Sequence, residues 1–135
     1  MAEDTEFPSI EQKKVTAWIK DTVNLYSKKD GRINYIFCSD ERILEVNRQY
    51  LQHDYYTDII TFDYSQGNKI SGDIFISLDT VKSNSVEQGT DYKEELLRII
   101  IHGVLHLCGQ NDKLPEDKAE MTHKENQALA HYLDS

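Results

Sequence analysis

Cysteine and proline are scarce in this chain of 135 residues, which has two of each. Cys38 and Cys108 stand far apart in the sequence, and neither has a cysteine neighbour. Small extracellular domains that depend on disulfides carry several closely spaced cysteines, so the sequence excludes that class of protein. We expect a protein of the reducing cytoplasm.

Long apolar runs and an excess of basic charge are also missing. No run approaches the roughly 20 residues that a helix needs to cross a bilayer, and the acidic segment Met1 to Glu6 contains no hydrophobic export signal. We therefore expect neither membrane insertion nor export. The 15 Lys and Arg residues stand against 24 Asp and Glu, and the formal net charge of −9 disfavours a protein that coats nucleic acid by charge alone. Any contact with RNA should be local.

The length and composition predict one folded domain over residues 1–135. Hydrophobic residues make up 39% of the chain and charged residues 29%, which is too apolar for a disordered protein. A chain of this length buries about two-thirds of its unfolded surface around a single core.

Apolar periodicity and turn residues predict an α+β domain, in which a small sheet of three to four short strands is flanked by helices. A Ser-x-x-Gln capping box at Ser9 opens the first helix, and Ser39-Asp40 can cap the second. The segment between the last two predicted strands has hairpin character, so these two should be antiparallel. The predicted helices begin near residues 10, 40, 79, 91 and 114, and the predicted strands cover residues 33–38, 57–64 and 73–78.

Two histidines interrupt the most apolar of the predicted helices. Residues 96–107 are apolar almost all round, which predicts a central, buried helix. His102 and His106 stand four residues apart, so their imidazoles share one face of this helix. Burying both rings is costly unless each finds a partner, and no carboxylate stands four residues from either. A single metal ion would satisfy both rings at once.

Gly109 and Asp112 complete a spacing that is typical of zinc sites. Gly109 can end the helix in the left-handed conformation, after which Asp112 can fold back toward the histidines. The pattern His-x3-His-x2-Gly-x2-Asp matches the spacing of zinc proteins of the His-Glu-x-x-His-x-x-Gly-x-x-His type. We predict one zinc ion per chain, held by His102, His106 and Asp112, with a fourth position open for water.

The histidines and their neighbours also allow roles without a metal, or with a different ligand. The two histidines can instead be hydrogen-bonded residues of a core or cleft, with Asp112 capping a turn. Cys108 is an alternative zinc ligand, but two residues beyond His106 it points away from both histidines, and we expect it in the core. The remaining histidines are expected at the surface: His53, His123 and His131.

The residue after the first histidine argues against a peptidase. Zinc peptidases place a glutamate there to activate water, and this chain has Gly103. Metal-dependent hydrolysis of another type of bond remains chemically possible.

The segment from His102 to Gly109 resembles the signature of the YbeY family of bacterial metal-dependent endoribonucleases. That signature reads His-Gly-x-Leu-His-Leu-x-Gly-Tyr-Asp-His, and these eight positions stand in register with it. A second series of residues resembles the family's Asn-x-x-Tyr-Arg, Asp-x-Pro-Thr-Asp-Val-Leu-Ser-Phe and Gly-Asp-Ile motifs in the same order. It comprises Asn47-Arg-Gln-Tyr50, Asp54, Thr57-Asp-Ile-Ile-Thr-Phe62 and Gly72-Asp-Ile74. The likeness spans roughly residues 33–130.

The resemblance implies a zinc-dependent endoribonuclease that is specific for single strands and acts in the cytoplasm. Water on the metal would attack the phosphodiester. The implied partners are single-stranded RNA, ribosomal RNA and the ribosome, rather than DNA, with roles in ribosomal RNA maturation and ribosome quality control. The implied fold is a small mixed sheet flanked by helices, with the metal-bearing helix at its centre.

Three residues depart from the family pattern. Asp112 replaces a histidine, and its negative charge should make the water on the metal less acidic. Leu51 replaces an arginine, and Arg48, one helical turn earlier, is a candidate to contact phosphate in its place. Tyr56 replaces a proline. Leu51 favours the alternative of a ribosome-assembly or RNA-binding factor whose metal only braces the fold.

Overall fold

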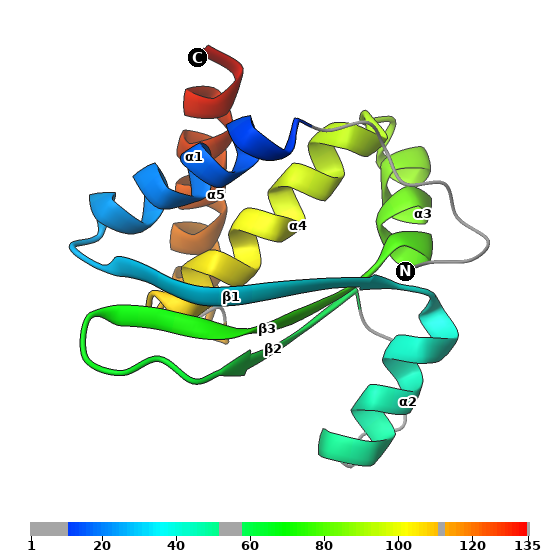
Figure 1. Ribbon diagram of the computed structural model, residues 1–135. Helices are drawn as coiled ribbons and strands as arrows, with labels where there is room; N and C mark the ends of the chain where they lie inside the picture. The colour runs from blue at the N-terminus through cyan, green and yellow to red at the C-terminus, as the bar shows by residue number, and fades with distance from the viewer. Residues whose placement is uncertain (1–10, 52–57, 111–112, 135) are drawn as a thin grey trace.

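Three strands form one mixed sheet in the computed structural model, which describes residues 11–51, 58–110 and 113–134 (Figure 1). The strands β1 (Lys29–Cys38) and β3 (Lys69–Ser77) run parallel, and β2 (Ile59–Asp63) pairs antiparallel with β3. The order is β1-β3-β2. The predicted antiparallel pair is therefore confirmed, whereas β1 begins at Lys29 rather than at Ile33. Thr57, where the second strand was expected to begin, lies outside the described residues.

The five predicted helices are all present, each beginning within a few residues of its expected start. The predicted capping box at Ser9 is wrong, because α1 begins at Gln12 with Glu11 as its N-cap; Ser9 itself lies outside the described residues. None of the helices in the described segments is long and apolar enough to cross a membrane. The helices are α1 (Gln12–Leu25), α2 (Asp40–Leu51), α3 (Leu78–Gln88), α4 (Tyr92–Leu107) and α5 (Pro115–Asp134).

The helices cover the two faces of the sheet unequally. Figure 1 shows α1, α3, α4 and α5 on one face and α2 on the other. Side chains alternate between the faces along each strand. On β3, Ile74 and Ile76 therefore enter the large core, while Phe75 packs against the smaller cluster that includes Ile43 and Val46 of α2. The main core thus lies between the sheet and the helices α1, α3, α4 and α5.

Two glycines allow α4 to lie close against the sheet. A Cβ atom on Gly103 would lie 3.0 Å from Ile59 Cδ1 and 3.1 Å from Ile74 Cδ1, and one on Gly72 would lie 3.1 Å from Leu107 Cδ2 of α4. Eight residues of α4 are buried, which confirms the predicted central helix. The candidate site is formed by side chains of α4 that are only partly buried, among them His102 and His106.

Candidate active site

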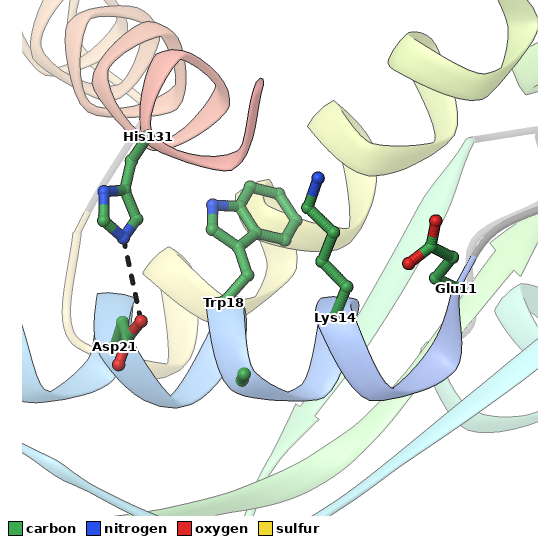
Figure 2. A pocket seen from close by; sticks show the side chains of 6 residues that line it. Glu11, Lys14, Trp18, Asp21 and His131 are labelled. Atoms are coloured by element: carbon green, nitrogen blue, oxygen red, sulfur yellow. Dashed lines mark ion pairs between the residues drawn. The ribbon is translucent and has the colours of Figure 1, made fainter. Parts of the chain in front are cut away.

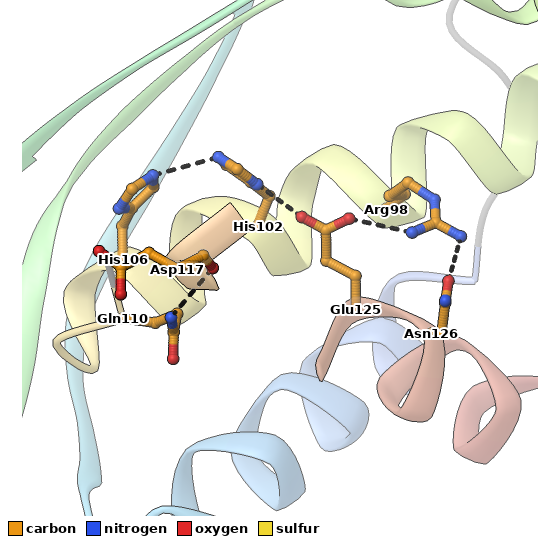
Figure 3. Close-up of polar contacts among 7 residues, drawn as sticks. All are labelled: Arg98, His102, His106, Gln110, Asp117, Glu125 and Asn126. Atoms are coloured by element: carbon orange, nitrogen blue, oxygen red, sulfur yellow. Dashed lines mark hydrogen bonds and ion pairs between the residues drawn. The ribbon is translucent and has the colours of Figure 1, made fainter. Parts of the chain in front are cut away.

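His102 and His106 of α4 face one another at the edge of the helix (Figure 3). Their Nε2 atoms are 3.1 Å apart, and their ring centroids 4.7 Å. Both side chains are partly buried. The spacing of four residues therefore brings the two imidazoles to one point, as the sequence predicts.

The separation of the two nitrogens matches a shared metal ion. Two imidazole nitrogens that each lie about 2.0–2.1 Å from a tetrahedral zinc ion are about 3.3 Å from each other. The 3.1 Å between His102 Nε2 and His106 Nε2 is close to this value. The residues present therefore fit a zinc ion without a large movement of either ring.

Glu125 of α5 holds His102 from the opposite side. Its Oε2 lies 2.6 Å from His102 Nδ1, and Glu125 is only 7% exposed. An ionised carboxylate can only accept hydrogen bonds, so Nδ1 of His102 carries the proton. In the neutral ring, Nε2 then presents its lone pair toward His106, which is the form that binds a metal.

A second contact secures Glu125. Arg98, one turn before His102 on α4, donates from Nη1 to Glu125 Oε1 at 2.9 Å and from Nη2 to Asn126 Oδ1 at 2.7 Å. A buried carboxylate needs such partners to offset its loss of water. Figure 3 shows the resulting chain from Asn126 through Arg98 and Glu125 to the two histidines.

The chain turns sharply just after the histidines. Gly109 has a φ of 101°, in the left-handed region, which confirms its predicted role in ending the helix. Gln110 then donates from Nε2 to the carbonyl oxygen of Asp117 at 3.5 Å and accepts from Lys124 Nζ at 2.6 Å. These contacts tie the end of the α4 segment to α5. Asp112, the predicted third zinc ligand, lies outside the described residues.

Comparison with known proteins gives a consistent family. The family model described as endoribonuclease YbeY matches residues 1–133. The chain belongs to the YbeY endoribonuclease family. It is therefore a nuclease and a hydrolase, as the resemblance implied.

The relatives cover nearly the whole chain. Endoribonuclease YbeY of Parabacteroides distasonis is 66% identical over 129 residues, which are 96% of this chain and 91% of that protein. Endoribonuclease YbeY of Bacteroides fragilis is 62% identical over 128 residues, with coverage of 95% and 92%. The solution structure of TM1509 from Thermotoga maritima superimposes with a TM-score of 0.66 at 25% identity, over 93% of this chain and 85% of that one.

The position of Gly103 explains why this YbeY chain has no peptidase glutamate there. Gly103 is buried, and a Cβ atom would meet Ile59 and Ile74 of the sheet. A side chain at this position points into the core and not toward the two histidines. The helix therefore packs in a way that excludes the peptidase arrangement.

The arginine that lies beside His102 is Arg98, and not Arg48, which the sequence predicts as a phosphate contact. Arg48 is exposed in the last turn of α2, and the side chain of Leu51 lies outside what the structure describes. Within the described residues, Arg98 is the cation that lines the pocket beside His102. The proposed phosphate-contacting role of Arg48 stays a prediction.

The alternative ligands that the structure describes lie as expected. Cys108 packs against the main core, and burial raises the pKa of its thiol. His123 and His131 are exposed on α5, and His131 pairs weakly with Asp21 at 3.7 Å. His53 lies outside the described residues. Among the described residues, no three His, Cys, Asp or Glu side chains gather into a metal site, and the third predicted ligand, Asp112, is not one of those residues.

A pocket of about 220 Å³, here called the α3–α4 pocket, borders His102. Val81, Asn84 and Gln88 of α3 line one side, and Ile99 and His102 of α4 line the other. Among the described residues, this concave surface adjoins His102, and so it is a candidate place for substrate next to the site.

A larger pocket between α1 and α5 lacks such chemistry (Figure 2). Its volume is about 440 Å³, and its lining includes Lys14, Trp18, Asp21 and His131. Trp18 Nε1 donates to the carbonyl oxygen of Ala128 at 2.7 Å, which is a structural contact. The side chains of Asp21 and His131 are 62% and 61% exposed. This pocket shares none of its lining with the histidine pair.

Sequence reasoning missed Glu125 and Arg98. Glu125 lies 23 residues beyond His102, and α5 brings the two together. The sequence did carry one signal, because Glu125 stands in the buried stripe of α5 between Met121 and Leu129. A carboxylate at a core position needs a partner, and His102 is a suitable one.

Proposed function

We propose that this protein cleaves single-stranded RNA with one zinc ion held by His102, His106 and Asp112. The observation that carries this proposal is the 3.1 Å separation of the two Nε2 atoms, with His102 Nδ1 held by Glu125. When bound, zinc supplies Lewis-acid chemistry, because it stabilises negative charge on a phosphodiester and makes water more acidic.

The residues of the chain would each have a defined part in this site. Glu125 keeps the proton of His102 on Nδ1, so that Nε2 stays free. Arg98 holds Glu125 in place. Gln110 contacts Asp117 and Lys124 of α5, which fixes the chain just after the helix that carries both histidines. Such preorganised ligands give up little conformational entropy when the metal binds.

The natural substrate in this proposal is ribosomal RNA, with the ribosome as partner, in the cytoplasm. The support is family membership, since the relatives are named endoribonucleases. A net charge of −9 favours local contacts near the site over broad attraction to phosphate. Residues 1–135 would act as one domain, because α1, α3, α4 and α5 share one main core with the sheet, and α2 packs on the opposite face of the same sheet.

Metal analysis and RNA cleavage together test this function. Protein purified without chelator or nickel column should contain about one zinc ion per chain. It should cut a single-stranded RNA oligonucleotide, lose this activity with chelator, and regain it when zinc is added.

Two variants give the matched comparison. His106→Ala should lose both zinc and cleavage, whereas His123→Ala, which changes an exposed histidine of α5, should lose neither. Absence of every transition metal, with no uptake of added zinc, would refute the site. Zinc uptake without cleavage of any RNA would instead support the alternative, a metal-braced RNA-binding or assembly factor.

A further inference from the structure

The size of the α3–α4 pocket limits what can enter it. Its volume of about 220 Å³ is below the range of about 300–1,000 Å³ for pockets that enclose a whole small molecule. It suits one flat group, such as a single ring or two fused rings. Since His102 forms part of its wall, anything bound there lies next to the candidate metal site.

The walls of the pocket combine apolar surface with unused carboxamides. Val81 and Ile99 are among the lining residues, and their aliphatic side chains form the apolar part of the wall. Asn84 and Gln88 stand four residues apart on α3 and therefore share one face. Within the described residues, neither carboxamide has a hydrogen-bond partner. Asn and Gln side chains, with a donor and an acceptor side by side, read the edges of nucleobases.

The charges around the pocket favour an uncharged group inside it over a phosphate. Asp58, Glu95 and Glu125 line it with three carboxyl groups, against the single guanidinium of Arg98. That guanidinium already donates to Glu125 and to Asn126. The surplus of negative charge repels an anion but not an uncharged base.

We propose that the α3–α4 pocket receives one unpaired nucleobase of the RNA, held at its edge by Asn84 and Gln88. The phosphate of that nucleotide then lies beside His102. This inference rests on the proposed function, which it deepens. A base reaches such a pocket only after it leaves its stack and its pair, which gives a physical reason for cutting single strands and not duplexes.

Cleavage of RNA with single missing bases tests the proposal. The substrates are single-stranded RNA oligonucleotides with one cut site, in which each position in turn carries an abasic ribose. The variants are the double change Asn84→Ala/Gln88→Ala and the control Gln127→Ala, which removes an exposed carboxamide of α5.

We expect one position beside the cut at which the abasic ribose raises the KM of the unchanged protein about 5- to 150-fold. In the double variant the KM for intact RNA should already be raised, and the abasic ribose should add little, because both changes remove one contact. Additive losses at every position, or an equal rise in Gln127→Ala, would overturn the assignment.

Binding to metal-free protein separates this proposal from the zinc site. The four ribonucleoside monophosphates and ribose 5-phosphate are titrated into ¹⁵N-labelled protein stripped of metal. The side-chain amide signals of Asn84 and Gln88 should shift with at least one nucleotide and not with ribose 5-phosphate. If no nucleotide shifts these signals, the assignment of the pocket to a nucleobase is wrong, even if the protein cleaves RNA in a zinc-dependent way. If these signals shift but the zinc-loaded protein cleaves no RNA, the proposed function is wrong and the assignment of the pocket to a nucleobase stands.

Discussion

Glu125→Gln should weaken zinc binding about 10- to 100-fold, because it removes one acceptor from a group that serves two donors. Glu125 Oε2 lies 2.6 Å from His102 Nδ1, and Oε1 lies 2.9 Å from Arg98 Nη1. A carboxamide has one acceptor oxygen and one NH2 group. If the oxygen keeps Arg98, the NH2 group faces His102 Nδ1, and the ring must move its proton to Nε2. That proton blocks the lone pair that a metal needs.

The opposite orientation of the new carboxamide also loses one of the two contacts. If its oxygen keeps His102, the NH2 group faces the donors of Arg98, and the two groups must separate. A 10- to 100-fold loss corresponds to about 1.4–2.8 kcal/mol of zinc-binding free energy. The metal-free protein should also lose about 1–3 kcal/mol of unfolding free energy through the disrupted charge-assisted bond. The lower end is expected, since the side chain of Arg98 is 33% exposed.

Competition with a chromophoric chelator measures the zinc affinity, and Glu116→Gln is the matched control. Glu116 is exposed in the first turn of α5, so its loss of charge should leave the affinity unchanged. Nitrogen NMR of the metal-free protein reports which ring nitrogen of His102 carries the proton, and this readout does not depend on activity. Equal affinities for Glu125→Gln and the unchanged protein, with the same tautomer of His102, would refute the reasoning.

Three further changes test separate parts of the molecule. Asp112→Ala should weaken zinc affinity measurably but less than His102→Ala, because water replaces a carboxylate more easily than an imidazole held on a helix. If chelator competition shows an unchanged affinity for Asp112→Ala, the third ligand is a different residue. Gly72→Ala should lower the free energy of unfolding in urea by about 1–3 kcal/mol, because the new methyl group would lie 2.3 Å from the carbonyl oxygen of Phe62; an unchanged urea midpoint would contradict this. Burial raises the pKa of the Cys38 thiol to about 11, so at pH 8 the folded protein holds little Cys38 thiolate. Because the thiolate is the reactive form, iodoacetamide should modify Cys38 far more slowly in the folded protein than in protein unfolded in urea. Equal rates would show that the thiol is accessible and ionised in the folded state.

Local order is where reasoning from the sequence succeeded. The starts of the helices, the left-handed Gly109 and the antiparallel pair of β2 and β3 depend on residues close together in the chain, so periodicity and turn chemistry predict them. His102 and His106 belong to the same class, because four residues along a helix place two side chains on one face.

The tertiary structure decided everything that joins distant segments. The parallel pairing of β1 with β3 crosses α2 and β2 in the sequence, and no local pattern specifies it. Glu125 reaches His102 only because α5 packs against α4, and Asn84 and Gln88 border the site only because α3 does so too. The sequence by itself determined which helix carries the histidines and that they share one face. Packing of the surrounding helices determined their protonated nitrogen, their charged neighbours and the pocket beside them, because these depend on contacts between residues far apart in the chain.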